Sequence, residues 1–172
     1  MRKLTGAVLV VAWALWAPSA LAQGTASANI NALAEVFAAV NVTAEQDLDF
    51  GNVIPGTDKS VDITAATAGR WLVQGSDDAE VTLSFPSLPS SLVDVGSNTL
   101  PIVYGATDAG FNTTNAPGTA TTFDPASGAT ANIGNTPAEL YVWIGGTVQP
   151  GSGQPAGNYA GTITLQATYT GN

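Results

Sequence analysis

The sequence contains no cysteine and no histidine, and only four of its 172 residues are lysine or arginine. A chain without cysteine forms no disulfide and offers no thiolate, and the lack of histidine removes the commonest general base. Zinc sites are usually built from the same two residue types and are excluded as well. We therefore expect a protein that is not an enzyme and that holds no metal and no cofactor.

Positive charge is scarcer still once the first 22 residues are set aside. Lys59 and Arg70 then remain against thirteen carboxylates, which gives a net charge of −11. Such a chain is repelled by phosphate backbones and by anionic lipid surfaces. After residue 22, no apolar run approaches the ~20 residues that span a bilayer. We expect no nucleic acid partner and no direct membrane insertion of the mature chain.

Residues 1–22 have the three-part order of a secretory signal peptide. A basic start precedes an apolar stretch from 7 to 16, and an Ala-Leu-Ala cleavage site follows at 20–22. The sequence therefore predicts export to the periplasm, the cell surface or the medium. Residues 23–172 would form a single domain, since about 150 residues is the usual size of one.

Nineteen glycines and ten prolines divide the chain into short pieces that favour strands joined by turns. Apolar and polar residues alternate at 60–64, 80–85 and 162–169, and from 140 to 144 both faces are apolar, as in a covered central strand. Residues 107–135 indicate long loops around one weak strand at 121–123. The prediction is an all-β, immunoglobulin-like or pilin-like Greek-key β-sandwich with seven to ten strands between about residues 27 and 170.

Residues 26–44 carry an apolar side chain at every even position, which favours a strand. Ile30, Leu33, Phe37 and Val40 also follow a helical spacing, so strand and helix both stay open over 30–40. A long amphipathic strand near a free terminus can complete its own sheet or insert into a neighbour's groove. The residues that would face such a groove are Ala26, Ala28, Ile30, Ala32 and Ala34.

Two blocks are more specific than composition. The first is Gln-Asp-Leu-Asp-Phe-Gly at 46–51 with Ile-Pro-Gly at 54–56, and the second is Gln-Pro-Ala-Gly-Asn-Tyr-Ala-Gly at 154–161. Proline followed by glycine suits a type II turn, and a tyrosine after the second turn can bond back to the backbone as a tyrosine corner. We assign these structural roles to Phe50, Gly51, Pro55, Gly56, Pro155, Gly157 and Tyr159.

Together these blocks resemble the bacterial secreted family known as domain of unknown function 4402. The likeness extends, more distantly, to spore coat protein U and to the β-sandwich subunits of chaperone-usher pili. It spans nearly all of the mature chain, with its specific residues in the two blocks. The resemblance implies a β-sandwich fold and an exported location, for a family without an established activity. Pilin-type subunits usually carry a cysteine pair that this chain lacks.

Three chemical patterns have simpler explanations. Residues 151–156 fit a dinucleotide fingerprint, but a strand follows where that site needs a helix. The carboxylate pairs at 47 with 49 and at 78 with 80 could chelate calcium, but solvated acids on a sheet rim are the simpler explanation. Trp71, Tyr141 and Trp143 could form an aromatic platform for a sugar ring, or they could pack in the core.

The function expected from the sequence is structural. We expect an exported, non-catalytic protein of the cell surface or of an extracellular fibre, with itself or other surface proteins as partners. The alternative is a carbohydrate-binding module that uses the aromatic platform.

Overall fold

The computed structural model describes residues 25–171, so the predicted signal peptide at 1–22 lies outside the described residues. The chain divides into two units, residues 1–35 and residues 36–172. In the first unit, the described residues 25–35 have no regular secondary structure and are exposed. Every strand in the described part of the chain belongs to the second unit.

The second unit is all-β, with twelve strands and one 3-10 helix among its described residues. The elements are β1 (Asn41–Gln46), β2 (Lys59–Val61), β3 (Gly69–Gln74), β4 (Glu80–Ser87), β5 (Ser91–Val93), β6 (Thr99–Val103), β7 (Ala109–Asn112), η1 (Pro117–Thr119), β8 (Thr121–Phe123), β9 (Ala129–Asn132), β10 (Glu139–Ile144), β11 (Gly146–Val148) and β12 (Thr164–Tyr169). No helix among the described residues is long and apolar enough to cross a membrane.

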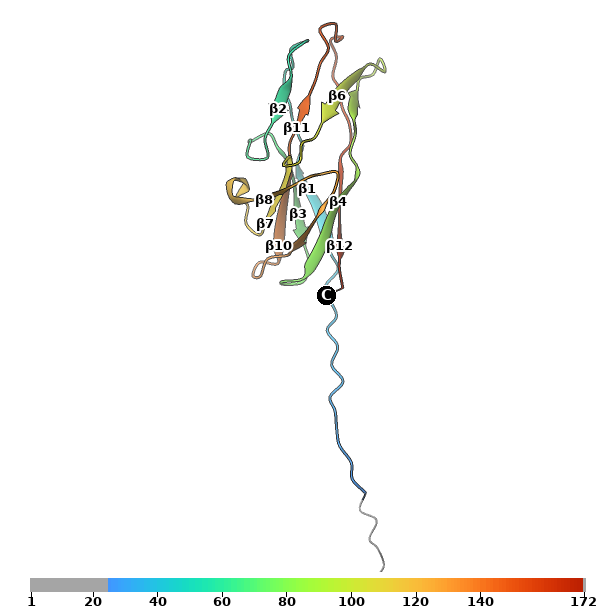
Figure 1. Cartoon of the computed structure of the whole chain (residues 1–172), viewed down its shortest axis with the longest axis vertical. Coiled ribbons are helices and arrows are strands. Elements are labelled where there is room, and N and C mark those ends of the chain that lie inside the picture. Colours follow the sequence, from blue (N-terminus) through green and yellow to red (C-terminus); the bar gives the residue numbers. More distant parts are fainter. Residues whose placement is uncertain (1–24, 172) are drawn as a thin grey trace, which may run out of the picture. The chain divides into compact units, whose positions relative to one another are not determined.

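The strands form three sheets in which every pair is antiparallel. A five-stranded sheet has the order β1-β3-β10-β7-β8, and a three-stranded sheet has the order β12-β4-β9. A four-stranded sheet, β2-β11-β6-β5, lies at the other end of the domain (Figure 1). The predicted all-β sandwich is confirmed.

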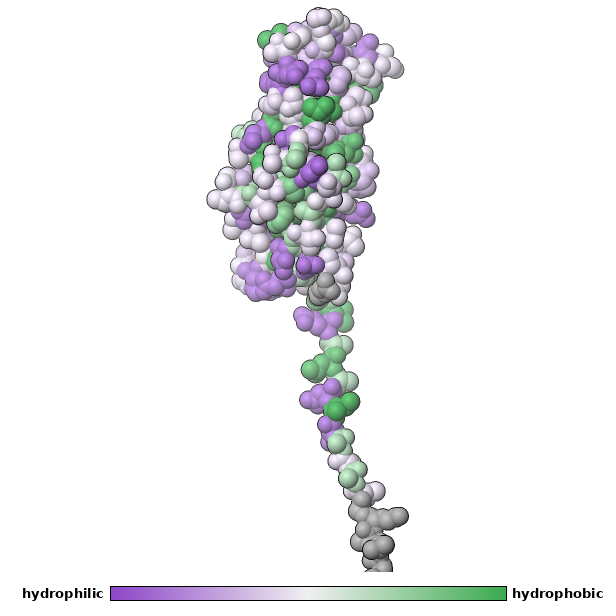
Figure 2. Space-filling model, in the orientation of Figure 1, coloured by the Kyte–Doolittle hydropathy of each residue, from purple (hydrophilic) through white to green (hydrophobic). Residues whose placement is uncertain are grey.

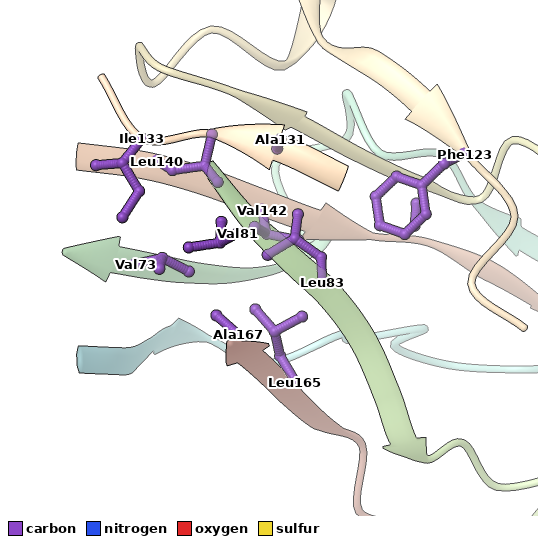
Figure 3. Close-up of a cluster of buried hydrophobic side chains, with 11 residues drawn as sticks. Val73, Val81, Leu83, Phe123, Ala131, Ile133, Leu140, Val142, Leu165 and Ala167 are labelled. Carbon is purple, nitrogen blue, oxygen red and sulfur yellow. The ribbon is translucent and has the colours of Figure 1, made fainter. Parts of the chain in front are cut away.

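The main core lies between the five-stranded and the three-stranded sheets, because both contribute buried side chains to one cluster. Val81 and Leu83 of β4 are fully buried, and Leu165 and Ala167 of β12 point into the same space (Figure 3). The alternation that predicted these two strands is therefore confirmed. The central strand β10 adds Leu140 and Val142, which are also fully buried.

A bend at two glycines carries the chain from β10 into β11, and so from the first sheet into the four-stranded sheet. Gly145 packs so closely against β2 that a Cβ there would collide with the carbonyl oxygen of Val61. Beyond the bend a second cluster forms, with Phe50, Ile102 and Val148 among its buried residues. The domain therefore has two apolar clusters, of which the second adjoins the candidate site.

Some predicted elements are wrong. Residues 25–40 form neither strand nor helix, and the first strand begins at Asn41. A strand needs a hydrogen-bonding neighbour, and alanine side chains are weak β-formers. Residues 107–135 contain β7 and β9 as well as the expected β8, and the strand expected at 60–64 ends at Val61. The strand count exceeds the seven to ten that were predicted.

Candidate functional site

The first block forms its predicted turn, whereas the turn predicted at Pro155 and Gly157 is wrong. The chain turns just before it, at Ser152 and Gly153, where the Gln154 N–H donates to the Gly151 carbonyl oxygen at 3.0 Å. The Thr57 N–H donates to the Ile54 carbonyl oxygen at 3.1 Å, and Gly56 takes the positive φ of 75° that a type II turn requires. The Tyr159 hydroxyl donates to the Pro155 carbonyl oxygen at 2.8 Å and accepts from the Gln154 side-chain amide at 2.7 Å. The tyrosine corner is therefore confirmed.

The two blocks also form the two sides of one groove, which sequence reasoning did not predict. Residues 46–53 and 154–161 both line a cavity of about 900 Å³. The first segment continues from β1, and the second leads into β12. Residues about one hundred positions apart in the chain therefore face one another across an open space.

The lining of the groove is largely apolar. Leu100, Ile102 and Val148 come from the four-stranded sheet and are almost fully buried, and Phe50 belongs to the same cluster. Leu92 adds a partly buried side chain to it. The groove therefore opens directly onto the second apolar cluster, and an apolar occupant would extend that cluster.

Backbone groups along both sides of the groove are unpaired. The Val93 N–H donates to the Ala160 carbonyl oxygen at 2.8 Å, and Ala160 donates back at 3.0 Å. Successive residues of an extended chain direct their N–H and C=O groups to opposite sides. Because the groups of Ala160 face β5, the N–H and C=O groups of Tyr159 and Gly161 point away from β5, toward the groove that both residues line. Within residues 25–171, the N–H groups of Tyr159, Gly161, Leu48 and Phe50 donate to no protein acceptor.

The strands next to these segments are sheet edges. β1 pairs with β3 alone, and β12 pairs with β4 alone, in the described part of the chain. An edge strand with free N–H and C=O groups is a template for pairing with another strand. The groove thus combines an apolar floor with unpaired backbone N–H groups on its sides, and it adjoins two sheet edges. This combination suits an extended peptide better than a small polar ligand.

The rim of the groove is acidic and polar. Asp47 is exposed, and the Asp49 carboxylate accepts from the Gly51 N–H at 2.7 Å, which closes a local turn. The Lys59 ammonium donates to the Asn52 carbonyl oxygen at 2.9 Å, beside the groove. These bonds give Asp49 and Lys59 roles in holding the loop.

The N-terminal residues proposed for assembly lie in the first unit. Ala26, Ala28, Ile30, Ala32 and Ala34 are all exposed, and Ile30 is 95% exposed. Leu33, on the alternate side of an extended chain, is 91% exposed. Figure 2 shows hydrophobic residues recurring along this segment. The segment is therefore rich in apolar surface that is not packed.

The structure does not bring the three platform residues together. Tyr141 and Trp143 stack at 6.1 Å on one face of β10. Trp71 pairs with Val142 across the sheet and so shares the opposite, inner face, where it packs against Phe85 at 5.8 Å. Trp143 is only 3% exposed. The predicted three-residue sugar platform is wrong, because the pairing register divides it between two faces.

Other polar groups of the domain lie outside the groove. The Asp78 carboxylate accepts from the Asn135 side-chain amide at 2.7 Å. No group of three or more metal-binding side chains occurs among the described residues. The hydrogen bond from the Thr64 hydroxyl holds the pKa of Asp62 below its usual value, and burial raises the pKa of Tyr104 to about 12.

Comparison with protein families gives a match that covers most of the chain. The family model described as "Domain of unknown function (DUF4402)" matches residues 40–169. The matched region runs from β1 to β12 and includes both sides of the groove. No curated protein matches the sequence.

Proposed function

Because the chain belongs to the DUF4402 family, whose members share a domain of unknown function, we propose its role from its own surfaces. The role is that of an exported, non-catalytic structural protein, at the cell surface or in an extracellular fibre, which works through protein–protein contacts. The secretory pattern of residues 1–22 supports export. The strongly acidic mature chain favours a protein partner over nucleic acid or an anionic membrane.

The observation that carries this proposal is the exposed apolar surface of the N-terminal segment. Ile30, Leu33 and Val36 are each more than 90% exposed. Burial of one such side chain contributes about 1.5–3 kcal/mol, so their exposure in a single chain leaves a large driving force for association. Clustered apolar surface of this kind marks interaction sites.

The test measures association and its dependence on this segment. The mature chain, residues 23–172, is compared by analytical ultracentrifugation with a variant lacking residues 23–35. We expect the mature chain to form larger species as its concentration rises and the shortened chain to remain a monomer. A mature chain that stays monomeric, and that retains no surface protein from its own cells, would refute the proposal.

Export is tested separately. N-terminal sequencing of the protein from the producing cells should find Gln23 as the first residue of the exported form. Retention of the full chain inside the cell would contradict an extracellular role.

A further inference from the structure

We infer that the groove between residues 46–53 and 154–163 receives the N-terminal segment of a second copy of this chain, as an added strand. This inference rests on the proposed function and names its partner and receptor. The occupant is the stretch from residue 25 to residue 36. Four properties of the segment and the groove match.

The first match is between the apolar face of the segment and the apolar floor of the groove. In an extended chain, even-numbered residues share one face, and from Ala26 to Val36 every one of them is apolar. The opposite face carries mainly polar residues, such as Asn29 and Asn31. One face can therefore cover Phe50 and Ile102 of the floor while the other meets water.

The second match is in length. Each side of the groove comprises about eight to ten residues, which would cover roughly 26–33 Å at 3.3 Å per residue if fully extended. The turn between Asp49 and Gly51 and the bend at Gly157 make both sides shorter than that. The segment from 25 to 36 spans about 40 Å at the same rise. It is long enough to occupy the full groove and still reach its own domain.

The third match is in charge. Residues 25–34 contain no charged side chain, and Glu35 is the single one up to Val36. The groove rim carries the carboxylates of Asp47 and Asp49. A neutral strand avoids repulsion by this rim, whereas an acidic strand from elsewhere in this chain would not.

The fourth match is in backbone hydrogen bonding. The N–H groups of Leu48 and Phe50 on one side, and of Tyr159 and Gly161 on the other, donate to no acceptor within residues 25–171. A strand placed between them offers carbonyl groups to both sides. Residues 25–36 have no strand partner among residues 25–171, so one pairing would satisfy both sets.

The absence of native cysteine gives a direct test by disulfide trapping. The donor chain carries Asn31→Cys, or Asn29→Cys to sample a second register, on the face directed away from the groove floor. The receiving chain carries Asp47→Cys on the exposed rim, together with Ile30→Asp to disable its own segment. The control receiver carries Thr130→Cys in place of Asp47→Cys, because Thr130 is also exposed but lies on β9, a sheet edge that does not line the groove.

On mild oxidation of the mixture we expect a covalent dimer of one donor and one receiver with the Asp47→Cys receiver. With the Thr130→Cys receiver we expect no such dimer. A second pair keeps the test independent of trapping. Ile30→Ser in the unmodified chain should weaken association, because it removes an apolar side chain from the contact with the groove floor, whereas Asn31→Ser, the same replacement on the face that meets water, should leave it intact.

The possible outcomes distinguish a failure of the groove as the receptor from a failure of self-association itself. If the chain associates and loses association without residues 23–35, but Asp47→Cys traps no dimer in either register, the groove is not the receptor and the proposed function stands. Equal trapping at Thr130→Cys also overturns the inference, because pairing is then not specific to the groove. If the mature chain never associates, both the inference and self-association fail together.

Discussion

The hydroxyl group of Tyr169 holds the start of the domain in place, and its removal gives the most direct test of the packing described above. It accepts a hydrogen bond from the Ser76 N–H at 2.8 Å and donates one to the Ala38 carbonyl oxygen at 2.9 Å. The Ala38 N–H completes the arrangement by donating to the Ser76 hydroxyl at 2.7 Å. The tyrosine ring also meets Phe37 edge to face at 5.2 Å.

Tyr169→Phe keeps the ring and deletes both bonds of the hydroxyl. A hydrogen bond of this kind contributes about 0.5–1.5 kcal/mol net, so two bonds give roughly 1–3 kcal/mol. The hydrogen bond to Ala38 is exposed and the one from Ser76 is only partly buried. The free energy of unfolding should therefore fall by an amount in the lower half of that range, about 1–2 kcal/mol. For a chain of this size the melting temperature should fall by about 2–8 °C.

The assay combines thermal melting with amide hydrogen exchange. In Tyr169→Phe the Ala38 amide should exchange faster than in the unmodified protein, while amides of β10 keep their relative protection. The control is Tyr141→Phe, whose hydroxyl donates to the Glu139 carboxylate at 2.9 Å and holds no N-terminal residue. An unchanged melting temperature together with unchanged exchange at Ala38 would refute the reasoning.

Four further predictions concern the turns, the core and the acidic loops. Tyr159→Phe removes the bonds to Pro155 and Gln154 and should cost about 1–2 kcal/mol in urea unfolding, and a cost near zero would contradict the corner. Leu83→Ala, at a fully buried position, should cost about 2–5 kcal/mol in the same assay, so a smaller cost would argue against the main core. Gly56→Ala should lower the free energy of unfolding by about 1–2 kcal/mol because the φ of Gly56 is positive. Gly151→Ala should leave it nearly unchanged, because a Cβ there meets no neighbour within 4 Å. Equal losses for the two variants would contradict the turn. Because the folded pKa of Asp62 lies below its ordinary value of 3.8, the stability it supplies is present above that pH and is lost as pH falls through the folded pKa. Asp62→Asn should therefore reduce the loss of stability at low pH, measured as the fall of the urea midpoint between about pH 5 and pH 2. The same fall in the variant and in the unmodified protein would disprove this.

The sequence predicts the strands whose side chains alternate strongly and misses those formed by small residues. β4 and β12 alternate apolar with polar residues, so the sequence alone predicts which of their side chains are buried. β7 and β9 consist of Ala, Gly, Asn and Thr with one Phe, and they are strands because β10 and β4 supply hydrogen-bonding partners. The even-numbered alanines from 26 to 34 show the reverse case, since the alternation exists there without a partner strand in the described part of the chain.

The parts of the candidate site were predictable, but their assembly was not. Pro55, Gly56 and Tyr159 follow from local turn chemistry, which depends on neighbouring residues. That their segments face one another depends on long-range packing over Ile102 and Val148. The division of the aromatic platform likewise depends on the register of β3 against β10, which places Trp71 opposite Val142.

The groove and the N-terminal segment are different surfaces of one chain, and this has a consequence for any structure they build. A contact between unlike surfaces leaves one vacant receptor and one free segment on every pair, so addition can continue without closure. The resulting filament would be polar, with an open groove at one end and an unpaired leading segment at the other. Its growth would stop when a subunit that lacks one of the two surfaces is added, or when the chain of subunits closes into a ring.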